Sequence, residues 1–187
     1  LISAPDFGSL TELLTLVSFL SLQDVRERPI EHTHKADDAH QKFVDARSDF
    51  LTILKMWDWI ETVKRRESKS SFKKTLKKNF LNFRRTVEWL ETRHQMARIC
   101  KTLGLQTNTD KASYRAVHLP MIIGNLSNLA RLKDKTQYQG ARNQSLMIFP
   151  GSGLFKKKHA WIVSTEILET RRIYARDAAS IRPSWVE

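Results

Sequence analysis

The first half of the chain repeats apolar residues at intervals of three and four, which is the spacing of one face of an α-helix. The repeat begins at Leu10 and ends before Gly104. It predicts amphipathic helices that pack their apolar faces against a common core. The charged residues 64–69 are expected to form a solvated linker between two of these helices. The helices themselves are expected over about residues 10–22, 36–44, 49–63 and 72–103.

Polar residues at the helix starts refine these bounds. Ser9 and Glu12 have the form of a capping box, in which each side chain bonds the free backbone N–H of the other residue. Ser48 or Asp49 can cap the third helix, and Asn82 can cap a break inside the last one. The long final stretch therefore reads as one helix or two.

The pattern changes after residue 128 to short runs of β-type residues separated by turn residues or charge. Before this change, 106–110 is the best candidate for a linker, and Ser113–Asn125 predicts a helix that Pro120 should interrupt and kink. Five short strands in about 50 residues are typical of a small Greek-key barrel of the OB type. The strands are expected over residues 129–132, 137–140, 145–149, 160–168 and 171–178.

These patterns together predict an α+β fold with a helical region over 1–105 and a five-stranded OB-type barrel domain, with a leading helix, over 106–187. The apolar-rich run 13–22 is too short to cross a bilayer, so no membrane partner is expected. A lone cysteine, Cys100, excludes an internal disulfide and is typical of the reducing cytoplasm. Because the chain does not begin with Met, it is expected to be a piece of a longer protein.

The charge balance points to a polyanionic partner. Thirty-two Lys and Arg residues against twenty Asp and Glu give a net charge of +12 and a pI of about 10.0. Nucleic acid is the first expectation for such a balance and an acidic membrane surface the second. A merely basic soluble protein is the plainer interpretation.

Part of this charge is concentrated between Lys64 and Arg98, where twelve basic residues face three acidic ones. A phosphate-tracking stripe and a solvated helix face explain this stretch equally well. On a single helix, two adjacent edges would carry the basic residues Lys74, Lys78 and Arg85, and Lys73, Lys77 and Arg84.

The segment 148–158 combines an apolar strand, a glycine-broken turn and three consecutive lysines. Backbone N–H groups at Gly151 and Gly153, with the Ser152 hydroxyl, could hold a phosphate. The turn does not fit a serine-hydrolase elbow, because Pro150 and Leu154 stand where that motif has glycine. A tight turn that also contacts an anion is the better interpretation.

No other constellation predicts catalysis or metal binding. The histidines and aspartates of residues 31–40 lack the spacing of a zinc site, so a polar loop is favoured there. No carboxylate pair stands out as an acid and base, so no catalytic residue, cofactor or metal is expected in this chain. Core packing is the first expectation for all five tryptophans, although base stacking is the alternative for the two at or near strands, Trp161 and Trp185.

Several segments resemble the helicase-associated and OB-fold regions of DEAH-box RNA helicases, in particular the bacterial HrpA type. The resemblance runs in the family's order through nearly the whole chain, and it is most specific in the barrel segment. The segments are 21–29, 48–51 with Trp57, 79–84, 138–143, 149–157 and 182–187.

This resemblance implies a C-terminal accessory fragment of an ATP-dependent 3′-to-5′ RNA helicase, monomeric, that clamps single-stranded RNA against the motor domains of the same chain. ATP and magnesium belong to those motor domains, whose motifs this chain lacks. The resemblance, with charge alone for Lys158, makes seven residues candidate RNA contacts. These are Arg142, Gly151, Ser152, Gly153, Lys156, Lys157 and Lys158.

Two other functions stay open at this point. The same surfaces could serve as a docking module for the motor domains or for a helicase cofactor without touching RNA. A freestanding enzyme dependent on Ser152 is the third and least supported hypothesis.

Overall fold

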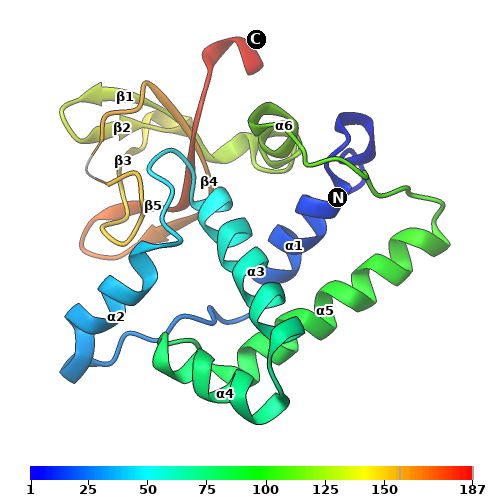
Figure 1. Cartoon of the computed structure of the whole chain (residues 1–187). Coiled ribbons are helices and arrows are strands. Elements are labelled where there is room, and N and C mark those ends of the chain that lie inside the picture. Colours follow the sequence, from blue (N-terminus) through cyan, green and yellow to red (C-terminus); the bar gives the residue numbers. More distant parts are fainter. Residues whose placement is uncertain (156, 187) are drawn as a thin grey trace.

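The computed structural model describes residues 1–155 and 157–186. In this part of the chain six α-helices precede a closed barrel of five strands, so the α+β prediction is confirmed. Figure 1 shows the barrel on one side of α1 and α3, with α4 and α5 on the other. The helices are α1 (Leu10–Leu20), α2 (Thr33–Gln41), α3 (Asp49–Arg66), α4 (Lys69–Lys78), α5 (Phe83–Thr102) and α6 (Tyr114–Gly124).

The long apolar repeat of residues 72–103 is divided between α4 and α5. The Asn82 side chain accepts a hydrogen bond of 3.0 Å from the backbone N–H of Arg85, which confirms the predicted internal cap. Between the helices, Phe80 takes a left-handed backbone conformation with φ of 53°. Because the chain turns here, the basic residues of α4 and α5 do not share the helical edges that a single helix would give them.

Two predicted helix boundaries were wrong. The charged residues 64–69 are mostly helical, because α3 continues to Arg66 and α4 begins at Lys69. Basic residues in the last turn of α3 lie at the negative end of its dipole, which favours continuation. The second helix begins and ends three residues earlier than expected, so part of the expected polar loop is α2.

The predicted interruption of the leading helix at Pro120 was also wrong. Helix α6 continues through this residue as one helix.

The predicted capping box at Ser9 and Glu12 does not form. Ser9 is fully buried, and its hydroxyl donates to the Ala4 carbonyl at 3.4 Å instead of capping α1. The Glu12 carboxylate instead accepts from the Asn108 side chain and the Ala112 backbone N–H, each at 2.9 Å. These bonds fasten the 106–110 segment to α1.

The barrel closes in the order β1-β2-β3-β5-β4. Neighbouring strands are antiparallel except β3 and β5, which are parallel. All five predicted strands are present, with bounds shifted by no more than three residues. They are β1 (Leu129–Asp134), β2 (Gln137–Gln139), β3 (Ser145–Ile148), β4 (Trp161–Glu169) and β5 (Ile173–Ile181).

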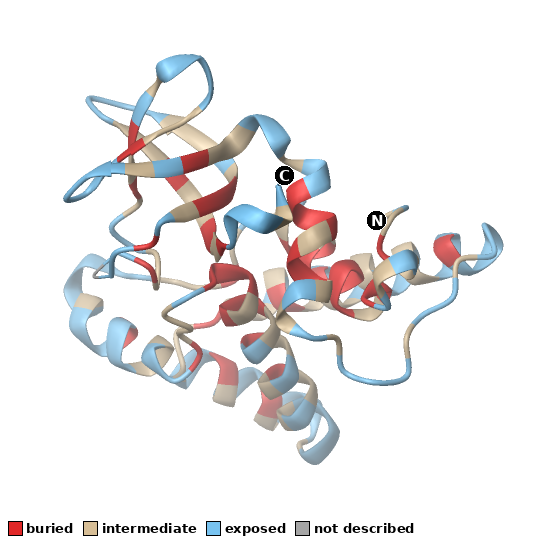
Figure 2. Ribbon diagram, turned by 90° about the horizontal axis from the view of Figure 1, so that it is seen from above, coloured by how far each residue is buried: buried red, intermediate tan, exposed pale blue. Residues whose placement is uncertain are grey.

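Two hydrophobic clusters hold the fold together. One fills the barrel and includes Tyr138, Leu146 and Leu154. The other unites α1, α3, α5 and α6, and it also takes in Val163 and Ile181 from the barrel. Figure 2 shows the buried residues gathered in the middle of the molecule, where helices and strands meet. Apolar burial therefore joins the barrel to the helices.

The predicted burial of Cys100 and of the tryptophans is confirmed. Cys100 is 5% exposed and belongs to the helical core. Trp89 is fully buried and donates from its indole N–H to the Thr15 carbonyl at 3.1 Å. The other four tryptophans are partly buried against the same core.

Candidate nucleic-acid interface

The loop between β3 and β4, residues 149–160, is fastened to the start of α3 by one carboxylate. Asp49 accepts hydrogen bonds from the Ser152 hydroxyl at 2.6 Å and from the Gly153 backbone N–H at 2.9 Å. It also accepts from the Ala178 backbone N–H of β5 at 2.9 Å. A single buried side chain thus joins a helix start, a loop and a strand.

The turn of this loop fits closely against the helical region. A Cβ atom added at Gly153 would lie 2.3 Å from the Asp45 carbonyl oxygen, so only glycine allows the contact. The next residue, Leu154, is fully buried in the barrel core. The Ser152 hydroxyl also accepts from the Leu154 N–H at 3.1 Å, which completes the turn.

The predicted RNA contacts therefore differ in whether their polar groups are free to meet a ligand. The Ser152 hydroxyl and Gly153 N–H are already bonded to Asp49, whereas Gly151, Lys157 and Lys158 are exposed. Lys156 lies outside the described residues. Whether any of these groups contacts RNA stays a prediction.

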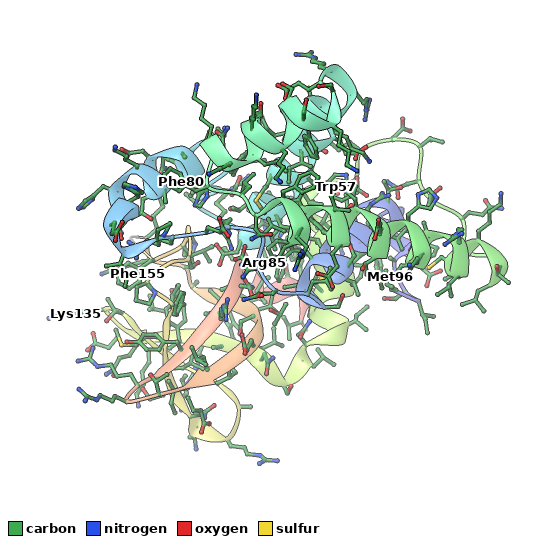
Figure 3. All side chains as sticks on the ribbon, turned by 90° about the horizontal axis from the view of Figure 1, so that it is seen from below. Trp57, Phe80, Arg85, Met96, Lys135 and Phe155 are labelled. Atoms are coloured by element: carbon green, nitrogen blue, oxygen red, sulfur yellow. The ribbon has the colours of Figure 1, made fainter. Side chains whose placement is uncertain are left out.

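Two further groups lie on the barrel surface. Arg142, also a predicted contact, is exposed in the turn between β2 and β3 with a left-handed φ of 52°. Phe155, which the sequence did not single out, is 43% exposed in the loop directly after Leu154. Figure 3 shows Phe155 at the edge of the molecule, toward the opposite side of the view from Met96 of α5. The loop thus presents one aromatic ring and two described lysines to solvent.

A second buried residue, His118 of α6, also holds the start of α3, through a hydrogen bond to Ser48. The Ser48 hydroxyl lies 2.7 Å from His118 Nε2, and His118 Nδ1 lies 2.6 Å from the Tyr114 carbonyl. Burial lowers the pKa of His118 to about 4, so the ring is neutral. Its Nδ1–H then donates to Tyr114, and Nε2 accepts from Ser48, whose oxygen accepts from the Leu51 N–H.

This serine–histidine pair is structural. Ser48 and His118 are both fully buried, and the Tyr114 ring stacks on the imidazole at 3.9 Å. The Tyr114 hydroxyl donates to the Ser180 carbonyl of β5 at 2.7 Å, and burial raises its pKa to about 12. The Ser48 cap was predicted, but nothing in the sequence around His118 indicated its partner.

Partly buried charges of both signs lie close enough to Asp49 to interact with it. Arg26 and Asp24 form an ion pair of 2.6 Å. Burial alone would raise the pKa of Asp24, but Arg26 brings it below its ordinary value. Burial also raises the pKa of Asp49, against its hydrogen bonds. Asp177 of β5 has a pKa raised to about 6 by burial and by the charge of Asp49.

Clusters of metal-ligating side chains and long apolar helices are both absent from the described residues. Among them, no three histidine, cysteine, aspartate or glutamate side chains come together as a metal site would require. None of the described helices has the length and apolar character needed to span a bilayer.

Comparison with known proteins gives two concordant findings. Residues 117–187 match the oligonucleotide/oligosaccharide-binding (OB)-fold family. The whole chain is 38% identical to the ATP-dependent RNA helicase HrpA homolog of Haemophilus influenzae and 37% identical to ATP-dependent RNA helicase HrpA of Escherichia coli. It is also 26% identical over 187 residues to human ATP-dependent RNA helicase DHX33.

The chain corresponds to only part of these relatives. It spans 14% of the length of each bacterial protein and 26% of the human one. In all three cases the whole of this chain is aligned. The likeness therefore extends over the helical region as well as the barrel.

Proposed function

Because the chain is homologous to the C-terminal region of DEAH-box RNA helicases of the HrpA type, we propose that it binds single-stranded RNA as an accessory part of such an enzyme. The observation that carries this proposal is the 38% identity over 188 residues, which covers helices and barrel alike. In the complete protein, ATP hydrolysis would reside in motor domains outside this chain. The chain would hold the strand against them.

The barrel-side loop is the proposed contact surface. Its anchoring to Asp49 fixes the backbone from which Lys157 and Lys158 extend into solvent. Exposed lysines contact phosphates as point charges and read no sequence. Together with Arg142 of the same barrel, these residues suit a strand of any sequence. The single residues assigned to RNA are part of this proposal.

The second candidate is a docking module without RNA contact. One observation favours it: the Ser152 hydroxyl and the Gly153 N–H, two of the three predicted phosphate donors, are bonded to Asp49 inside the molecule. On this hypothesis the loop is only a structural joint, and the same surfaces meet the motor domains or a protein cofactor.

Fluorescence anisotropy of a labelled single-stranded RNA of about 10 nucleotides, within the site size of one OB fold, distinguishes the two. We expect binding that weakens with salt. The double substitution Lys157→Gln and Lys158→Gln should lower the salt slope by about 1.4, since each lost contact on a single strand removes about 0.7. The matched control is Lys101→Gln with Lys111→Gln, two exposed lysines on α5 and in the following linker.

Unchanged affinity in the loop variant would remove the loop from the RNA site. No binding by the unaltered chain at low salt would favour the docking module. A loss that is equal in the control would mean that net charge, rather than the loop, sets the affinity.

A further inference from the structure

Helix α4 carries an unusual concentration of unpaired charge. Five of its ten residues are lysines, and it has no acidic residue. All five are exposed, and none forms an ion pair within the described residues. They are Lys69, Lys73, Lys74, Lys77 and Lys78.

This arrangement works against the helix itself. Three lysine pairs lie four residues apart, where like charges repel across one turn: 69 with 73, 73 with 77 and 74 with 78. Lys69 also stands in the first turn, where the positive end of the helix dipole disfavours a cation. Only Lys77 and Lys78, in the last turn, are favourably placed. Folding therefore does not account for this pattern.

Nearby carboxylates do not neutralise the helix. Glu67 accepts hydrogen bonds from the hydroxyls of Ser71 and Thr75 instead. Glu88 and Glu91 of α5 line a groove of about 770 Å³ together with Lys69 and Lys73 and form no ion pair with them. At the other end of α4, Lys42 adds a sixth ammonium group, which donates to Asn79, the C-terminal cap residue.

The solvent-facing side of α4 itself carries charge and no large apolar side chain, and the partly buried Phe83 and Val87 of α5 line the adjoining groove, where Lys73 lies 5.8 Å from the Phe83 ring centre. The two large apolar side chains of α4, Phe72 and Leu76, are turned inward and buried. A stable protein partner needs an apolar centre to its interface, and the solvent-facing side of α4 supplies none. A phosphodiester backbone needs only a row of cations, and lysines on successive turns of a helix lie about 6 Å apart.

We propose that α4 is a second contact surface for the RNA backbone, separate from the loop 149–160. The proposal rests on the proposed function only in taking RNA as the ligand. Because α4 and the barrel lie on different sides of α1 and α3 (Figure 1), only an RNA long enough to pass around the helices would contact both surfaces, and it would bind more tightly than one that fills the barrel site alone. The contacts would be sequence-independent and sensitive to salt.

The test compares two matched variants, each lacking four cations. One replaces Lys73, Lys74, Lys77 and Lys78 with Gln, which keeps the helix propensity of α4. The other replaces four exposed cations of α5, the linker and α6, namely Arg98, Lys101, Lys111 and Arg115, with Gln. Anisotropy is measured across salt with single-stranded RNA of about 10 and about 30 nucleotides, the second longer than one OB-fold site. Circular dichroism verifies that both variants are folded.

The α4 variant should lose the extra affinity for the long RNA, by about tenfold or more at low salt, and its slope should fall by up to about 2.8. The short RNA should bind it nearly as it binds the unaltered chain. Equal binding of the long RNA by the α4 variant and the unaltered chain would overturn the proposal. Equal losses in both variants would do the same.

Two outcomes separate this proposal from the proposed function. If the loop variant loses RNA and the α4 variant does not, the barrel site stands and α4 is excluded. If the α4 variant alone loses RNA, the second surface stands and the loop is excluded.

A labelled Glu-rich peptide that binds α4 and resists displacement by RNA would assign the surface to an acidic protein and overturn the RNA proposal.

Discussion

The loop 149–160 and helix α4 are both candidate anion sites in the sequence, but only in the loop do the anion-binding groups have partners inside the protein. In the loop, the Ser152 hydroxyl and the Gly153 N–H are bonded to the internal carboxylate of Asp49. On α4, five lysines face solvent and form no ion pair with any described carboxylate.

The difference follows from burial. Hydrogen-bonding groups at a packed junction must find partners inside the protein, because an unsatisfied donor there is costly. An exposed ammonium group is satisfied by water and needs no internal partner. A turn rich in donors therefore indicates an anion without saying whether that anion belongs to a ligand or to the chain. An unpaired cluster of cations more directly indicates an external partner.

The largest expected effect comes from breaking the loop's internal anchor. Asp49→Ala leaves three donors without their acceptor: the Ser152 hydroxyl and the N–H groups of Gly153 and Ala178. Since each unsatisfied buried donor costs about 1–3 kcal/mol, we expect the free energy of unfolding to fall by about 4 kcal/mol. Urea denaturation followed by tryptophan fluorescence measures it.

The control for this change is Asp58→Ala on the exposed face of the same helix, where Lys111 is 3.9 Å away. A weak surface pair of this kind should contribute no more than about 0.5 kcal/mol. If the two alanine variants lost equal stability, Asp49 would not be the joint between loop and helix.

A smaller effect concerns the negative charge next to this anchor. Asp177 has a raised pKa of about 6 because of burial and the neighbouring Asp49, with Arg26 and Arg176 opposing the shift. Its unfolded value is about 3.9, so the folded state binds the proton more tightly. Its contribution is therefore fully present below about pH 4 and is lost as the pH rises through 6.

Asp177→Asn removes this cost, and asparagine tolerates the left-handed φ of 49° at this position. We expect the variant to be more stable than the unaltered chain by about 1–2 kcal/mol at pH 8 and equal to it near pH 4. Thermal unfolding across this pH range measures the difference. A stability gain that does not change with pH would exclude the titration of Asp177 as its cause.

The elements of the fold were readable because each depends on local periodicity. Apolar residues spaced three and four apart predicted the buried faces of α1, α3, α4 and α5, and the change to short β-type runs predicted the barrel strands. The internal cap at Asn82 was also visible, since it acts three residues along the chain.

Contacts between distant residues could not be predicted in the same way. Asp49 and Ser152 lie 103 positions apart, and Ser48 and His118 lie 70 apart. Ser48 and Asp49 were identified only as alternative helix caps, and Ser48 alone has that local role. The capping box of Ser9 and Glu12 failed for the same reason, because the Glu12 carboxylate accepts from Asn108 and Ala112, which lie 96 and 100 positions away.

The smallest effect tests the other side of the comparison, the charge of α4. Replacing only Lys69 and Lys73 with Gln removes two of the three like-charged pairs, each of which destabilises a helix by about 0.2–0.5 kcal/mol, and leaves Lys77 and Lys78 in the last turn. It also removes a cation from the first turn, where the positive end of the helix dipole disfavours it. We therefore expect this variant to gain about 1 kcal/mol of unfolding free energy at low salt. The gain should shrink near 1 M salt, where the screening length is about 3 Å. Urea denaturation at both salt concentrations measures it, with the double variant of Lys101 and Lys111 as control.

A loss of stability in this α4 double variant would mean that the lysines stabilise the fold, and their clustering would then need no external anion. A gain, together with weaker binding of long RNA by the four-lysine α4 variant, would show that α4 retains charges that oppose its own folding because they serve a ligand.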